Sequence, residues 1–331
     1  MNMIRYIINL FLLISVALAT DFDVKMISKR NLPEDVIEVL NYDRIVTQTK
    51  DIIFIKEYDG SSYSKVIFDY PLPAKTEYLR SNSPDYIVMA KRGEYFEETL
   101  IDLSTMEVIP LRYKDGNAFA LQVSATDGLI GYQTRTKEKG ATRSTYLYNR
   151  REKPVYLMDD IMGLVWAPNG KWFLANSTYG RRSVSRVLVS REGERISLPT
   201  GDIGISGAIW SPSGDVLIAN RGGEVTIIGF DWVNGRPERI SYRTEILNYN
   251  SAVGSFFSPN GEYVVWANEN NDSRGHNNIG YDIMISDKYL SQISGLIVHE
   301  NILEIPITWT QKNGLVTRLE NQMISYKIST R

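Results

Sequence analysis

The sequence has no cysteine and only two histidines, His276 and His299. The lack of cysteine excludes disulfides, thiolate nucleophiles and zinc sites built on cysteine. Two histidines are too few for a histidine-cluster metal site, and a Ser–His–Asp mechanism would have to use one of them. The G-x-S-x-G motif of α/β hydrolases is missing as well. A non-catalytic protein is therefore the favoured interpretation, and an enzyme is the alternative.

An excess of positive charge is also missing. Lys and Arg number 37 and Asp and Glu number 39, which gives a formal net charge of -2. A protein whose main partner is nucleic acid or an anionic membrane normally carries a clear basic excess. The composition therefore predicts a protein that does not bind nucleic acid, and we expect a monomer with a protein partner.

One long hydrophobic run is present, at the N-terminus. Arg5 is the only charge before an apolar stretch that extends from Tyr6 to Ala19 and ends in the small-x-small pattern of a cleavage site. A membrane-spanning helix needs about 20 apolar residues. We therefore predict a cleaved signal peptide at residues 1–19, no transmembrane segment after cleavage, and one domain at residues 20–331. A membrane anchor or a buried helix is the alternative. An exported chain of this size without disulfides is typical of the bacterial periplasm, so we predict a periplasmic or secreted protein.

Three short stretches in the second half of the chain share one pattern: Val165–Gly170, Ile209–Gly214 and Phe256–Gly261. Each has an apolar pair, a small residue, Pro, a turn-forming residue and Gly, and an apolar run follows. Pro presets φ, Asn or Ser bonds to the local backbone, and Gly supplies positive φ. The pattern predicts a strand that enters a tight turn and leaves as a second strand.

The turns recur at a spacing typical of a repeat protein. Gly170, Gly214 and Gly261 are 44 and 47 residues apart, and Gly128 precedes Gly170 by 42. Weaker copies are predicted at Ser83–Asp85, at Asn313–Gly314 and, weakest of all, at Thr49–Asp51. A period in the forties with strand-like runs predicts an all-β, seven-bladed β-propeller, with six blades as the fallback.

The two ends of the chain are complementary in this scheme. The last blade is one strand short, and Phe22–Ile27 is a spare strand near the N-terminus. We predict that this strand becomes the outer strand of the last blade, which closes the ring and removes exposed edges. Trp166, Trp210 and Trp309 occupy equivalent positions beside the turns, and we expect them to pack between blades.

The turns at Trp166–Gly170, Trp210–Gly214 and Phe257–Gly261 resemble the W-S-P-D-G signature of TolB-like propeller repeats. The resemblance covers about 150 residues, from Val165 to Gly314. Asn or Ser stands where the family usually has Asp, which leaves the turn chemistry intact. The resemblance implies the propeller fold and not membership of a Tol–Pal system, since the α/β domain that precedes the propeller in TolB is missing. WD-type repeats fit less well, because their Gly-His and Trp-Asp markers are absent.

Ligands of propellers usually bind at one mouth of the central channel, where the second-to-third and fourth-to-first strand connections lie. The second-to-third connections of blades 3 and 4 are basic, and that of blade 6 is long and polar. The predicted partner-binding residues are Arg135, Lys137, Lys139, Arg143, Arg181, Arg182, Asp272, His276 and Asn277. We predict that they bind a protein or an anionic partner of the cell envelope. The competing interpretation is a set of solvated charged loops.

The fourth-to-first connections contain carboxylates that could converge on the same mouth. Asp160, Asp202 and Glu300 are the predicted metal ligands, and the only cofactor suggested is Ca²⁺ or another divalent cation. A divalent-cation-dependent hydrolase or lactonase-type propeller is therefore the alternative to an exported, non-catalytic binding or scaffolding protein. Asp is also a favoured turn residue, which explains its presence without any metal.

Overall fold

A computed structural model describes most of the chain, and every regular element in the described residues is a β-strand. The described residues are 22–33, 36–39, 44–49, 51–57, 61–67, 76–80, 85–91, 97–109, 111–113, 116–135, 143–177, 185–198, 208–221, 224–246, 255–270, 280–291, 293–297, 304–309, 314–319 and 321–330. Within these ranges no helix is long and apolar enough to cross a bilayer. The predicted signal peptide, residues 1–19, lies outside them.

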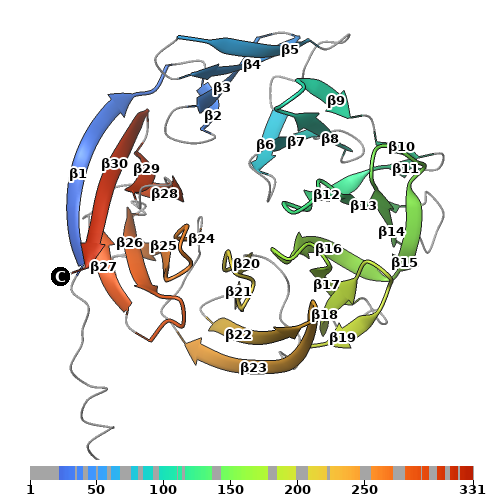
Figure 1. Ribbon diagram of the computed structural model, residues 1–331. Coiled ribbons are helices and arrows are strands. Elements are labelled where there is room, and N and C mark those ends of the chain that lie inside the picture. The colour runs from blue at the N-terminus through green and yellow to red at the C-terminus, as the bar shows by residue number, and fades with distance from the viewer. Residues whose placement is uncertain are drawn as a thin grey trace, which may run out of the picture.

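Seven antiparallel, four-stranded sheets stand around a central opening (Figure 1), so the chain is a seven-bladed β-propeller. From the innermost strand outwards, blade 1 is β2 (Val36–Val39), β3 (Arg44–Gln48), β4 (Ile52–Glu57) and β5 (Tyr63–Ile67); blade 2 is β6 (Thr76–Arg80), β7 (Tyr86–Lys91), β8 (Glu97–Asp102) and β9 (Glu107–Ile109); blade 3 is β12 (Phe119–Val123), β13 (Ile130–Arg135), β14 (Arg143–Tyr148) and β15 (Val155–Asp159). Blade 4 is β16 (Ile161–Trp166), β17 (Trp172–Ser177), β18 (Ser185–Ser190) and β19 (Arg195–Ser197); blade 5 is β20 (Ile209–Trp210), β21 (Val216–Arg221), β22 (Glu224–Val233) and β23 (Arg236–Ile246); blade 6 is β24 (Ser255–Phe257), β25 (Tyr263–Asn270), β26 (Gly280–Asp287) and β27 (Ile293–Ile297). A two-stranded hairpin of β10 (Arg112–Tyr113) and β11 (Gly116–Asn117) joins blades 2 and 3.

Blade 7 is built from both ends of the chain. It contains β28 (Glu304–Trp309), β29 (Gly314–Leu319), β30 (Gln322–Thr330) and, outermost, β1 (Phe22–Asn31). β1 pairs antiparallel with β30, from Phe22 opposite Thr330 to Asn31 opposite Gln322. The predicted ring closure by the N-terminal strand is confirmed, and the strand extends four residues further than predicted. The predicted seven blades are confirmed as well.

The structure corrects one of the seven predicted turns. Thr49–Asp51 joins β3 to β4, which are the second and third strands of blade 1. The first-to-second connection of this blade falls earlier, between Val39 and Arg44. The prediction was wrong because Asp before an apolar run fits any tight hairpin of a blade.

The turns that define the repeat have nearly the same geometry in blades 4, 5 and 6. Gly170 has φ 64°, Gly214 φ 74° and Gly261 φ 73°, in the left-handed region where residues with a side chain are strained. In each turn the glycine N–H donates to the carbonyl three residues earlier, at 2.8–2.9 Å. The turn-forming side chain adds a bond, as where Asn169 Oδ1 accepts from the Lys171 N–H at 3.0 Å. Local chemistry therefore fixes these hairpins.

The tryptophans beside the turns tie each blade to the blade before it. Each one is the last residue of an innermost strand, and its Nε1–H donates to a carbonyl of the preceding innermost strand. The bonds are Trp166 to Gln122 at 3.3 Å, Trp210 to Val165 at 3.3 Å and Trp309 to Phe256 at 3.4 Å. The predicted packing of these side chains between blades is confirmed. Blade 6 has Phe257 at this position, which cannot donate such a bond.

Apolar clusters fill the spaces between neighbouring blades. Between blades 4 and 5, for example, Trp172, Leu174 and Leu188 pack against Leu217 and Ile228. All five side chains are at most 3% exposed. Since each blade buries one face against each neighbour, the sheets hold the connecting loops in fixed relative positions.

Candidate binding face

The strand registers divide the connections between two faces of the ring. Antiparallel strands alternate in direction, so the second-to-third and fourth-to-first connections lie together on one face, which we call the mouth face. The first-to-second and third-to-fourth connections lie on the opposite face, which we call the turn face. In blade 3, Arg135 pairs with Arg143 at the edge of the second-to-third connection. In blade 4, Ser177 pairs with Ser185, and in blade 6 Asn270 pairs with Gly280. The three connections predicted to bind a partner therefore leave their sheets on the mouth face.

Few of the predicted site residues belong to the described part of the chain. The backbone of Arg135 is described as the end of β13, and Arg143 and Asp160 are described with their side chains. The remaining predicted residues lie outside the described ranges: Lys137, Lys139, Arg181, Arg182, Asp272, His276, Asn277, Asp202 and Glu300. Their roles in binding a partner or a metal remain predictions.

Arg143 is half-buried and turned towards the innermost strand of its own blade. Its guanidinium carbon lies 5.7 Å from the centre of the Phe119 ring, within the range of a cation–π contact. The Arg143 carbonyl accepts a hydrogen bond from the Asp160 N–H at 3.2 Å. The basic connection of blade 3 therefore begins and ends beside the first residues of β12 and β16.

Asp160 is the single residue between β15 and β16, and its φ is 61°. The carboxylate of its neighbour Asp159 accepts from the Ser144 hydroxyl at 2.7 Å, and the Asp159 carbonyl accepts from Arg195 at 2.8 Å. Asp160 itself is exposed. No group of three or more acidic or histidine side chains suited to a metal occurs in the described ranges. With Asp202 and Glu300 outside those ranges, the metal site remains a prediction.

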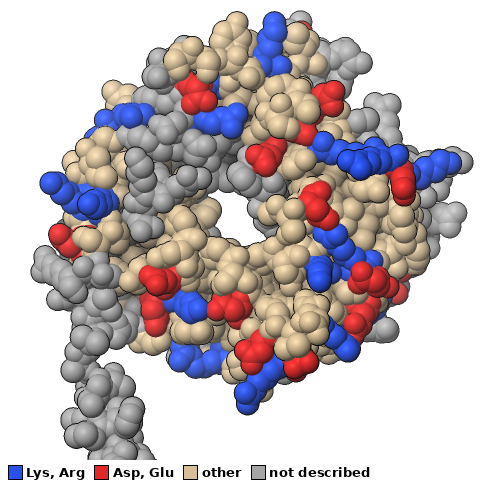
Figure 2. Space-filling view, in the orientation of Figure 1, with Lys and Arg blue, Asp and Glu red and all other residues tan. Residues whose placement is uncertain are grey.

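On the turn face, ion pairs cross four consecutive blade interfaces. Each joins a carboxylate of one blade to a cation of the next. The pairs are Asp102 with Arg150 at 2.6 Å, Asp127 with Arg191 at 2.6 Å, Glu194 with Arg236, and Asp215 with Lys288 at 2.7 Å. Acidic and basic side chains are interspersed around the opening on the face that Figure 2 presents. These charges hold blades together.

The carboxylates of two of these pairs are strongly acidic. Burial alone would raise the pKa of Asp102, but hydrogen bonds from Ser104, Arg150 and Thr105 outweigh it and lower the pKa to about 2. Burial likewise opposes ionisation of Asp215, and bonds from Lys288, Ser213 and Ser211 lower its pKa to about 2. Both carboxylates are therefore charged at any physiological pH.

Two buried polar side chains, absent from the sequence-based predictions, brace the innermost strands near the mouth face. Glu98 Oε2 accepts from the Leu121 N–H of the next blade at 2.6 Å. Gln133 donates to the Ile161 carbonyl at 2.9 Å and accepts from the Gly163 N–H at 3.2 Å. Burial raises the pKa of Glu98, against the bonds from Leu121 and Ala120. Both side chains lie within strands, so nothing in the local sequence distinguishes them from surface residues.

No model of a known protein family matches the chain, and no curated protein sequence matches it. Solved structures do. The propeller domain of Cps50 (Swd1) from Myceliophteria thermophila matches 93% of this chain and 100% of that chain, with 12% identity and a TM-score of 0.60. An oligogalacturonate lyase in complex with manganese matches 93% of this chain and 90% of that chain, with 9% identity and a TM-score of 0.57. At such identities the likeness shows the β-propeller fold alone. TolB from Acinetobacter baumannii matches over 86% of this chain and 79% of that chain, with 11% identity and a TM-score of 0.45.

Proposed function

We propose that the protein is an exported, non-catalytic β-propeller that binds an acidic protein or an anionic component of the cell envelope through its mouth face. The observation that carries this proposal is the register of blades 3 and 4. The connection between Arg135 and Arg143 and the connection between Ser177 and Ser185 leave neighbouring sheets on one face. The sequence gives the first connection four cations, counting its two ends, and the second connection two.

The contrast between the two faces supports the same function. On the turn face the described cations Arg150, Arg191, Arg236 and Lys288 each have a carboxylate partner in the preceding blade. Paired charges produce little long-range field, whereas a basic rim attracts an acidic partner and orients its approach. The buried Glu98 and Gln133 bind backbone groups, which favours a scaffold. The apolar stretch before β1 and the TolB-like turns favour export.

Charge reversal on the two faces tests this function. One variant changes Arg135, Lys137 and Arg181 to Glu, and the matched control changes the exposed Arg151, Lys153 and Arg239 to Glu. Binding to envelope extract, and its dependence on salt, is measured for both. We expect loss of binding in the mouth-face variant and retention in the control. Equal binding by both variants, or binding insensitive to salt, would exclude the basic rim as the binding site.

Export is tested separately with the full chain and a chain that begins at Thr20. Cell fractionation should place the full chain outside the cytoplasm and retain the shortened chain inside. Retention of both chains in the cytoplasm would contradict the proposed localisation.

A further inference from the structure

The innermost strand of blade 3 has a bulge that a buried carboxylate of blade 2 holds in place. In the pairing of β12 with β13, Phe119 lies opposite Gln133 and Gln122 opposite Gly131, so the register shifts between them. At the bulge, the Leu121 N–H donates to Glu98 Oε2 at 2.6 Å. The Glu98 N–H donates in turn to the Ala118 carbonyl at 3.2 Å. Glu98 is 7% exposed, and it therefore fixes the backbone on both sides of Phe119.

The bulge in blade 3 differs from its equivalent in the next blade. Ala120 has φ 52°, a conformation that is strained for a residue with a side chain. The residue in the same place in blade 4 is Gly163, with φ 72°. Gly207 and Gly254 stand at the same distance before the next two turns in the sequence. Blade 3 thus has alanine and a carboxylate where blade 4 has glycine and the amide of Gln133. Strain that the surroundings maintain is a frequent mark of functional positions.

The bulge determines where the Phe119 ring lies, and this ring supports Arg143. The guanidinium carbon of Arg143 lies 5.7 Å from the ring centre. A guanidinium that stacks on an aromatic ring can direct N–H groups sideways, in a planar fork that matches a carboxylate. Its five N–H donors exceed what one neighbouring acceptor uses. Arg143 is therefore presented as an oriented donor rather than as a mobile charge.

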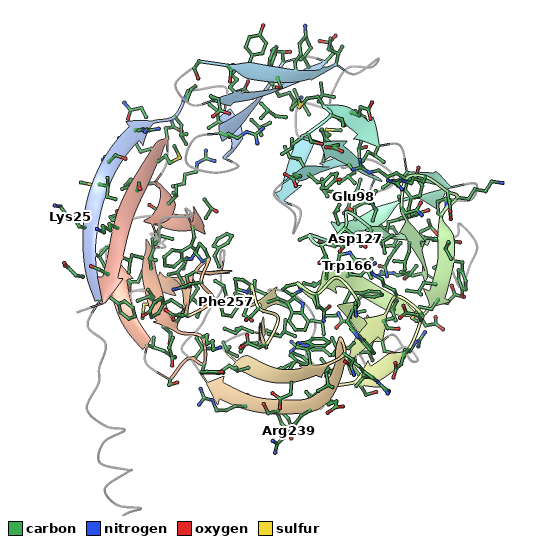
Figure 3. All side chains as sticks on the ribbon, viewed as in Figure 1. Lys25, Glu98, Asp127, Trp166, Arg239 and Phe257 are labelled. Atoms are coloured by element: carbon green, nitrogen blue, oxygen red, sulfur yellow. The ribbon has the colours of Figure 1, made fainter. Side chains whose placement is uncertain are left out.

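We propose that Arg143 is a carboxylate anchor for an acidic polypeptide at the mouth of the central channel, and that Phe119 and Glu98 are its positioning residues. This rests on the proposed function and names the ligand of the same face. Phe119 belongs to β12, the innermost strand of its blade, and Glu98 lies on the inner side of the ring, beside the opening (Figure 3). An extended polypeptide can enter such a concave place, whereas a flat bilayer cannot.

Fluorescence anisotropy with a labelled oligoglutamate peptide tests the anchor. Arg143→Lys keeps the charge but removes the planar fork, and Phe119→Leu keeps apolar bulk but removes the ring. We expect each change to weaken binding about three- to tenfold. Because the ring acts through the guanidinium, Phe119→Leu should have no further effect in the R143K background. An equal loss in both backgrounds would overturn the positioning role, since a general structural defect behaves in that way.

Glu98 supplies a second readout. Glu98→Gln keeps an oxygen that accepts from the Leu121 N–H, and it should bind oligoglutamate within about twofold of the wild type. Glu98→Ala should weaken binding as much as Phe119→Leu does. Arg239→Lys, on the outer rim (Figure 3), is the matched control and should change nothing. If Glu98→Ala binds as the wild type does, Glu98 has no positioning role.

The outcomes separate this inference from the proposed function. If reversal of Arg135, Lys137 and Lys139 to Glu abolishes oligoglutamate binding while R143K and F119L bind normally, the anchor is wrong and the basic rim stands. Binding to vesicles that contain phosphatidylglycerol, without binding to oligoglutamate, would overturn the polypeptide ligand. If the wild type binds neither probe, both proposals fail.

Discussion

Replacing Asp102 by Asn removes the negative charge from the ion pair between blades 2 and 3. The Asp102 side chain is 3% exposed, and it accepts from the Ser104 N–H at 2.8 Å, the Ser104 hydroxyl at 2.6 Å and Arg150 Nη1 at 2.6 Å. Its pKa of about 2, against 3.8 for an unperturbed Asp, corresponds to about 2 kcal/mol of stability at neutral pH. We therefore expect Asp102→Asn to lower the free energy of unfolding by about 2 kcal/mol at pH 7.

Urea unfolding between pH 7 and pH 2 measures this contribution and its sign. Because the pKa of Asp102 is lower in the folded chain, its stabilisation is complete above the unfolded pKa and is lost as the pH falls through the folded pKa. The wild type and Asp102→Asn should therefore differ by a constant amount above about pH 5 and converge towards pH 2. Asp231→Asn, at an exposed position, is the control. Equal stability of wild type and D102N at pH 7, or a difference that persists unchanged at pH 2, would refute the reasoning.

Three further changes test other parts of the structure. Trp210→Phe removes the bond to the Val165 carbonyl and should cost about 1 kcal/mol of unfolding free energy, measured in urea; an unchanged midpoint would contradict this. Ala120→Gly relieves the strain at φ 52° and should raise stability by about 1 kcal/mol, unless the bulge does not persist in solution. Thermal melting with Ca²⁺ and with chelator should give the same midpoint within about 1 °C. A rise with Ca²⁺ that Asp202→Ala removes would instead favour the cation-dependent alternative.

The repeat turns could be predicted because their chemistry is local. Pro168, Asn169 and Gly170 form a tight hairpin whatever surrounds them, so their recurrence gives the period of the blades. The turn at Thr49–Asp51 shows the limit of this approach. Asp in a hairpin does not tell the second strand from the first, and only the pairing of β3 with β4 assigns it.

The candidate site was predictable only at the level of its face. The cations at Arg135 and Arg143 are visible in the sequence, and the repeat places them on the mouth face. The contact of Arg143 with Phe119 depends on a bulge, and the burial of Glu98 depends on the neighbouring blade. Neither follows from local propensity. A signal was nevertheless present, since Ala120 stands where the next three repeats have glycine.

Site-specific photo-crosslinking in cells tests the central claim, that a partner binds at the mouth face, most directly. A photoreactive amino acid replaces Lys137 on the mouth face or, as the control, the exposed Glu152 on the turn face. We predict a crosslinked acidic partner from position 137 and none from position 152, with the crosslink lost in the R143K protein. A partner captured from position 152 alone would contradict the account.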